Sequence, residues 1–121
     1  SFIFVGVETT RKIVQQKPDA VTRFLRAYTE SIAIIKQDKE TALKAIGKFL
    51  KTDNRRALDG IYDDYVGAFP RVPMMTKEEV KAVLDVVKNP KGQHVQPEDF
   101  YDNSFVQKLE SSGFINSLYA R

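Results

Sequence analysis

The stretch from Pro18 to Gln37 constrains the fold of this chain more than any other part of its sequence. Its apolar residues recur at i, i+3, i+4 and i+7, which is the spacing of one face of an α-helix. Pro18 suits the first helical position, because its missing N–H would have no partner there in any case. The apolar residues make this the expected central helix; they are Val21, Phe24, Leu25, Ala27, Tyr28, Ile32, Ala33, Ile34 and Ile35.

Caps and prolines predict further helices on both sides of this central one. The expected N-caps are small polar residues, whose side chains can accept a bond from a free backbone N–H. They are Thr9 or Thr10 near the start of a short helix over residues 8–16, Asp38 for the third helix, and Thr52 or Asp53 for the fourth, which Pro70 ends. The apolar faces expected to be buried are Ala42, Leu43, Ile46, Phe49 and Leu50 in the third helix, and Leu58, Ile61, Tyr62, Tyr65, Val66 and Phe69 in the fourth.

The last third of the chain follows the same pattern. Thr76 and Glu79 have the spacing of a capping box, so they predict the start of a fifth helix. The breakers at residues 89–92 end that helix, Pro97–Phe100 forms a single turn, and Gly113 is a natural C-cap for the last helix. The expected buried residues here are Val80, Val83, Leu84, Val87, Phe105, Val106, Leu109, Phe114, Ile115, Leu118 and Tyr119, and the last helix is capped by Asp102 or Asn103.

One segment reads differently, because Phe2–Val7 is a short apolar run typical of a buried strand. No second strand is predicted that could pair with it. The expected fold is therefore mainly α, with one short N-terminal strand followed by five to six helices. Residues 1–121 form a single helical unit and residues 1–7 an orphan strand. We expect the chain to be a piece of a larger protein, whose upstream part would pair with this strand.

Composition excludes several classes of site. The formal net charge is +3, from 19 Lys and Arg against 16 Asp and Glu, and both signs are mixed along the chain, so no nucleic-acid partner is expected. The absence of cysteine excludes disulfides, thiolate metal sites and a cysteine nucleophile. The densest basic stretch is expected to be a solvated helix face, with a docking surface as the alternative; it comprises Arg11, Lys12, Lys17, Arg23 and Arg26.

No residue pattern predicts a catalytic, metal or cofactor site. His94 is the only histidine and has no ligand partner at metal-binding spacing, so it is expected to be an exposed loop residue. Single scattered glycines exclude a phosphate-binding loop. Two acidic groups have simpler interpretations than acid–base chemistry. Asp59, Asp63 and Asp64 read as a solvated face in which Arg55 pairs with Asp59, and Glu98, Asp99 and Asp102 read as helix caps.

Three stretches, in order, carry a resemblance to a known family. In residues 9–27 a polar helix ends in a Lys-Pro step, and the next helix reads Pro, two residues, Val, two residues, Phe-Leu and Ala. In residues 34–42 one helix stops and the next begins, and residues 97–105 hold a capped helix near the chain end. Together they resemble the nitrate, sulfonate, taurine and pyrimidine-precursor group of solute-binding proteins, which serve ABC importers.

The resemblance implies that the chain is the C-terminal part of a two-lobed α/β fold of the periplasmic-binding-protein type II class, which closes on its ligand like a hinge. The implied function is to capture a small solute and deliver it to an ABC transporter permease, in the periplasm or at the outer side of the membrane. No enzymatic activity and no cofactor are implied. The family's ligand contacts lie mostly in regions that find no match here, so the ligand-binding residues stay unknown, and a homodimer is possible.

Two other functions remain open from the sequence. A helical interaction module would expose an apolar patch on the fourth helix, lined by Tyr62, Tyr65 and Phe69. The other open function is an enzyme, because a pyrimidine-synthase branch shares the binding-protein fold. The reactive residues of that branch would lie upstream of this chain.

Overall fold

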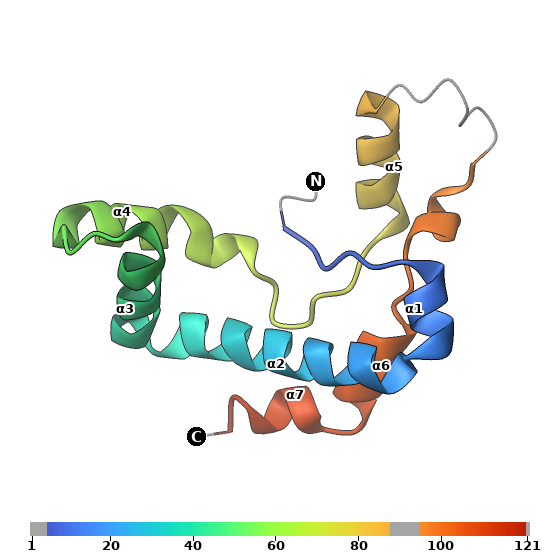
Figure 1. Ribbon diagram of the computed structural model, residues 1–121, viewed down its shortest axis with the longest axis horizontal. Coiled ribbons are helices and arrows are strands. Elements are labelled where there is room, and N and C mark those ends of the chain that lie inside the picture. The colour runs from blue at the N-terminus through green and yellow to red at the C-terminus, as the bar shows by residue number, and fades with distance from the viewer. Residues whose placement is uncertain (1–4, 88–94, 121) are drawn as a thin grey trace.

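The computed structural model describes residues 5–87 and 95–120, and within these residues every regular element is a helix (Figure 1). The long helix α2 is the spine of the molecule. At its C-terminal end α3 turns away from it and α4 folds back, whereas α6 and α7 lie along its other side and α5 projects at the opposite end. The helices are α1 (Arg11–Gln16), α2 (Pro18–Gln37), α3 (Lys39–Leu50), α4 (Arg55–Tyr65), α5 (Lys77–Val86), α6 (Ser104–Ser111) and α7 (Phe114–Ser117), with 3-10 turns η1 (Val66–Ala68) and η2 (Pro97–Phe100).

The predicted helix starts are confirmed at most positions. Thr10 caps α1 through the N–H of Ile13, and Asp38 caps α3 through the N–H of Thr41. Thr76 and Glu79 form the expected capping box at α5. Gly113 has φ +82°, in the left-handed region that a glycine tolerates best, and it separates α6 from α7. The apolar cluster expected after Gly113 thus forms a short helix of its own, which raises the number in the described part to seven.

Three boundaries differ from the prediction. Helix α1 begins at Arg11 and not at Glu8. Asn54, not Thr52 or Asp53, caps α4, because the Thr52 hydroxyl accepts a bond from the N–H of Asn54 and shifts the helix start. The fourth helix also ends at Tyr65, where a tighter turn follows, and does not continue to Phe69. Of the predicted strand, residues 1–4 lie outside the described residues, and Val5 to Val7 form no regular element.

The core lies between α2 and the C-terminal helices. It is formed by Leu25 of α2, Val106 and Leu109 of α6, and Ile115 of α7. Val72 and Met74 from the segment after η1 pack against this cluster. That segment is fixed by the side chain of Asn103, which accepts a bond from the Met75 N–H at 2.9 Å and donates one to the Met75 carbonyl at 2.8 Å. Thr29 is buried beside it without an unpaired group, because its hydroxyl donates to two carbonyls of its own helix.

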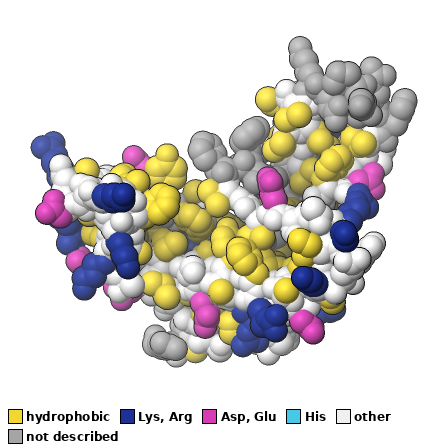
Figure 2. All heavy atoms as spheres, viewed as in Figure 1, with side chains coloured by type: hydrophobic (Ala, Val, Ile, Leu, Met, Phe, Trp, Pro, Cys, Tyr) yellow, Lys and Arg dark blue, Asp and Glu magenta, His cyan; other side chains and the backbone are white. Residues whose placement is uncertain are grey.

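Several residues predicted to be buried are exposed. Phe24 is 59% exposed, Phe49 85%, and Val87 57%, although each lies on a predicted apolar face. The chain exposes 9132 Å², which is about 2,500 Å² more than the roughly 6,600 Å² of a compact monomer of this size. Figure 2 shows hydrophobic side chains gathered along the hollowed side of the molecule, between the end formed by α3 and α4 and the end formed by α5. The chain thus forms more apolar faces than it covers by itself.

Candidate functional site

An apolar groove lies between the C-terminal half of α2, α3, α4 and η1. Its volume is about 460 Å³, which falls within the range of small-molecule and peptide-binding sites. Aliphatic and aromatic side chains dominate its lining, and the few polar residues belong to α2 and α3. The lining residues are Ser31, Ile34, Ile35, Thr41, Ala42, Ala45, Ile46, Ile61, Tyr62, Tyr65, Val66 and Phe69.

The groove exists because α3 and α4 form a tight helical hairpin. Lys51 adopts the left-handed conformation with φ +54°, which ends α3 and reverses the chain. The two helices then approach closely at Gly47, where an added Cβ would lie 2.8 Å from the Thr52 carbonyl oxygen and 3.3 Å from Leu58. Glycine is needed at this position because the neighbouring atom at 2.8 Å belongs to the backbone and is not a flexible side chain. The hairpin therefore has a fixed geometry at the turn.

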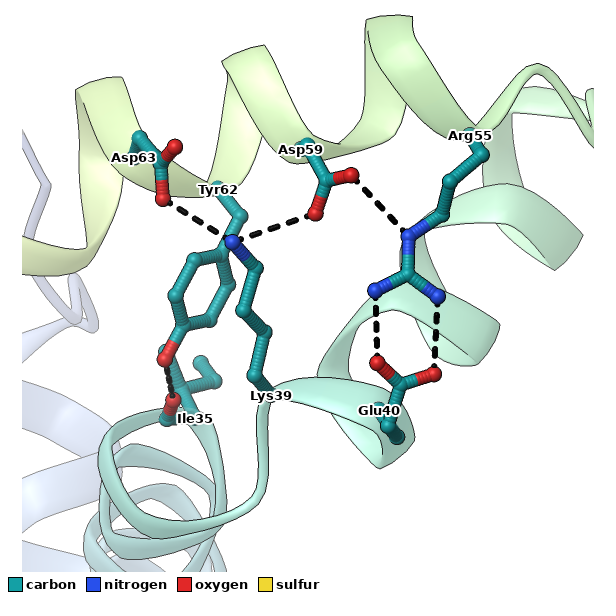
Figure 3. Close-up of polar contacts among 7 residues, drawn as sticks. All are labelled: Ile35, Lys39, Glu40, Arg55, Asp59, Tyr62 and Asp63. Atoms are coloured by element: carbon teal, nitrogen blue, oxygen red, sulfur yellow. Dashed lines mark hydrogen bonds and ion pairs between the residues drawn. The ribbon is translucent and has the colours of Figure 1, made fainter.

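A polar clamp holds α4 over the end of α2 (Figure 3). The Tyr62 hydroxyl donates to the Ile35 carbonyl at 2.7 Å, so the tyrosine contributes its ring to the groove while its polar end is bonded. Lys39 Nζ lies 3.1 Å from carboxylate oxygens of both Asp59 and Asp63, and 4.9 Å from the centre of the Tyr62 ring. One lysine at the start of α3 thus binds two turns of α4.

Arg55 completes the clamp at the other end of α4. Its guanidinium donates to both carboxylate oxygens of Glu40, at 2.9 and 2.6 Å, and its Nε donates to Asp59 at 3.0 Å. Asp59 therefore links Arg55 to Lys39, and with Asp63 and Glu40 the five charges form one continuous network (Figure 3). The fork geometry of Arg55 fits a carboxylate in a way that a lysine does not.

The clamp shifts the titration of its own groups. Hydrogen bonds from Arg55, and then from Lys39, hold the pKa of Asp59 below its usual range. Arg55 likewise lowers the pKa of Glu40, while the bonds to Asp59 and Asp63 raise the pKa of Lys39. Each shift favours the charged form, so the clamp stays ionised near neutral pH.

The groove is suited to binding an apolar group and not to catalysis. Three of its four hydroxyl groups are already engaged: Ser31 donates to the Ala27 carbonyl, Thr41 donates to Asp38, and Tyr62 donates to the Ile35 carbonyl. Among the described residues no three His, Cys, Asp or Glu side chains are placed to hold a metal ion. The groove can therefore accept an apolar body, such as one face of a helix or a ring.

The structure bears out the predicted roles of the two acidic groups except that of Glu98. Asp59 pairs with Arg55 as expected, and the other two aspartates of that group are exposed. Asp99 accepts the Gln96 N–H and Asp102 accepts the Ser104 N–H, so both act as caps. The five basic residues from Arg11 to Arg26 are exposed, and Arg26 stacks on Phe114 at 4.0 Å. His94 lies outside the described residues.

Sequence reasoning missed the contacts that join different helices. The Glu40 carboxylate is bound by Arg55 of α4. Lys39 carried no predicted role, yet it binds α4, and Glu98, which was expected to be a cap, pairs with Lys77 at 2.7 Å. Partners at i,i+4 lie on the same helix, so this spacing cannot predict pairs that join different helices.

A smaller hollow of about 220 Å³ lies at the other end of α2. The segment before α1 contributes Val7, Glu8 and Thr9 to it, and α2 contributes Ala20, Val21 and Phe24. None of the helices in the described part is long and apolar enough to cross a bilayer. Comparison of the chain with protein-family models, curated proteins and solved structures finds no match in any of the three.

Proposed function

We propose that the chain is the C-terminal part of a solute-binding protein that serves an ABC importer. The observation that carries the proposal is the resemblance of residues 9–27, 34–42 and 97–105, in that order, to the nitrate, sulfonate, taurine and pyrimidine-precursor group. The helix boundaries agree with the motifs: α1 ends before the Lys17-Pro18 step, and Asp38 separates α2 from α3. A short predicted strand at residues 1–7 belongs to the same proposal.

The uncovered apolar surface also supports this assignment. A chain that forms one part of a two-lobed α/β fold has faces that the rest of the protein covers, and such faces are exposed when the part is viewed alone. Solute capture would occur outside the cytoplasmic membrane, by closure of the lobes, and the permease would receive the solute. The proposal involves no covalent chemistry, so it assigns no catalytic residue and no cofactor.

The coding sequence upstream of residue 1 tests the proposal directly. We expect about 200 further codons, as a two-lobed protein requires, preceded by an export signal. The whole protein should then gain thermal stability from one member of a panel containing nitrate, taurine, an alkanesulfonate and a pyrimidine precursor, because a ligand that binds the folded state alone stabilises it. A start codon immediately before residue 1 would refute the proposal.

A helical interaction module is the second candidate function, and the groove favours it. Its wall contains Tyr62, Tyr65 and Phe69, which are the residues that the sequence places on one apolar face. Amphipathic helices bind in such grooves through apolar anchors at i, i+3 or i+4 and i+7. A displayed peptide library should then yield ligands with this spacing that bind the native chain and not Tyr65→Asp. Peptides that bind both proteins equally would contradict this function.

A further inference from the structure

Helix α2 is apolar on two opposite faces, and only one of them is covered. The covered face carries Leu25, Ile32 and Ala33, which are 8%, 1% and 3% exposed. A surface helix of a globular protein typically has one apolar stripe and a polar opposite face. A second apolar stripe therefore indicates a second contact. This stripe consists of Ala20, Phe24, Ala27, Ser31 and Ile34.

The second stripe has the geometry of a helix–helix contact. Its residues follow one another at intervals of four, three, four and three, so they stay on one line along the helix. Phe24 is 59% exposed and Ile34 47%, whereas the positions between them carry the small side chains of Ala27 and Ser31. The stripe also connects the two hollows, since Phe24 lines the smaller one and Ser31 and Ile34 line the groove.

We propose that this stripe is the contact between two copies of the chain, whose α2 helices lie antiparallel about a two-fold axis near Ala27. Under that axis Ala20 of each copy faces Ile34 of the other, and Phe24 enters the gap above Ser31 and Ala27. Large side chains thus meet small ones throughout, which is the complementarity that knobs-into-holes packing needs. A two-fold contact uses the same surface on both copies, and this stripe is complementary to itself.

The charges beside the stripe fit the antiparallel arrangement. Arg23 and Glu30 lie seven residues apart on the same flank, and neither forms an ion pair with another residue in the described ranges. Antiparallel pairing brings the Arg23 of each copy to the Glu30 of the other. In a parallel pair the same flank of the two helices would lie on opposite sides of the contact, so Arg23 and Glu30 would not meet. Charge pairing of this kind selects the orientation more than it adds affinity.

The contact can extend beyond the stripe itself. A stable interface of ordinary size takes about 800 Å² from each partner, and the stripe continues into the apolar lining of the two hollows. The inference uses this surface alone and does not depend on the proposed transport role. An apolar segment of a larger protein, or an apolar small molecule, is the alternative occupant that the experiments below distinguish.

Sedimentation and light scattering of the purified chain from about 1 to 200 µM test the dimer. Ala27→Glu should give a monomer, because two carboxylates would meet at the axis, while Ala57→Glu on α4 makes the same change at another exposed helical alanine and should leave the dimer intact. Both variants should keep the native helical circular dichroism. A native chain that stays monomeric at every concentration, or a dimer that survives Ala27→Glu, would overturn the proposal.

Charge reversal tests the orientation. Arg23→Glu and Glu30→Arg should each weaken the dimer about tenfold, and the double variant should return to within about threefold of the native dissociation constant. Losses that simply add in the double variant would exclude the antiparallel pairing.

Crosslinking offers an independent readout, since the chain has no cysteine of its own. Oxidised Ala27→Cys should form a covalent dimer and Ala57→Cys should not, because only residues at the axis come within disulfide range of their own copy. Equal crosslinking of the two variants would contradict the contact. A dimer of the 121-residue chain that disappears when upstream residues are added would identify the rest of a larger protein as the true occupant of the stripe.

Discussion

The two ends of α2 are held by different forces. Its N-terminal half packs through Leu25 against α6 and α7, where Leu109 is 4% and Ile115 1% exposed. Its C-terminal end carries the α3–α4 hairpin, in which α4 buries Leu58 alone among its described side chains and is fixed by the charged clamp around Lys39 and Arg55. Burial is strong and insensitive to pH and salt, whereas exposed ion pairs are weak and sensitive to both. Changes in pH or salt can therefore shift the position of the hairpin.

Removing a buried side chain from the apolar end should have the largest effect. Ile115→Ala should lower the free energy of unfolding by about 3 kcal/mol, because it leaves a cavity where the side chain is only 1% exposed. Leu50→Ala on α3, where the side chain is 47% exposed, should cost less than about 1 kcal/mol. Urea denaturation measures both. Equal losses would show that the contrast between the two ends is not real.

A methyl group at the hairpin turn should have the next largest effect. Gly47→Ala places a Cβ 2.8 Å from the Thr52 carbonyl oxygen, so the helices must separate, at a cost of about 2 kcal/mol. Gly60→Ala is the matched control, since nothing lies within 4 Å of its Cβ position. Because alanine favours helix by about 1 kcal/mol over glycine, this control should be more stable than the native chain. Thermal denaturation of the two variants should therefore shift in opposite directions.

The hydrogen bond between Tyr62 and the Ile35 carbonyl should contribute less. Tyr62→Phe removes the 2.7 Å bond and keeps the ring, so the free energy of unfolding should fall by about 1 kcal/mol. Tyr65→Phe, at a ring that is 49% exposed, should change it by less than about 0.5 kcal/mol. Hydrogen exchange should show faster opening of α4 in the first variant only. An unchanged exchange rate would mean that the clamp does not need this bond.

Acid should loosen the hairpin end before the apolar end, and this is the smallest effect. The pKa values of Asp59 and Glu40 are lowered in the folded chain, so the unfolded chain binds more protons in the acid range. The stability they contribute is complete above their usual pKa of about 4 and is lost as the pH falls through the lowered folded values. Arg55→Gln removes the principal cause of both shifts, so the acid loss measured by denaturation between pH 2 and 7 should become smaller.

Lys81→Gln is the control for that experiment. It removes an exposed i,i+4 pair with Asp85 on α5, away from the clamp, and should leave the acid dependence as it is. The same loss in both variants would assign the acid sensitivity to general charge and not to the clamp.

Local features of the fold could be predicted because they depend on residues three or four apart. The Thr76–Glu79 capping box and the Asp38 cap are of this kind, and both are confirmed. The Asn54 cap was missed because the left-handed Lys51 and the Thr52 hydroxyl together set where α4 begins. The mainly helical class follows from the same local signals.

Burial was harder to predict, because periodicity identifies an apolar face without saying what covers it. Phe24 and Phe49 have the spacing of core residues and are exposed. The aromatic wall of the groove was predicted, since Tyr62, Tyr65 and Phe69 follow one helical face, whereas the clamp through Lys39 was not, since it joins residues of different helices.

The packing of Leu25 against α6 and α7 has a consequence for how the chain would behave if it were cut. The core is built from two parts of the chain: α2, which contributes Leu25, and the C-terminal helices, which contribute Val106, Leu109 and Ile115. The segment between Phe69 and Asn103 is the only covalent link between these two parts. Arg71 adds a 2.8 Å bond to Asn116 beside this segment. A single proteolytic cut near Arg71 should therefore leave two fragments that stay associated, and neither fragment alone should fold. The protein is in this sense a natural candidate for a split reporter.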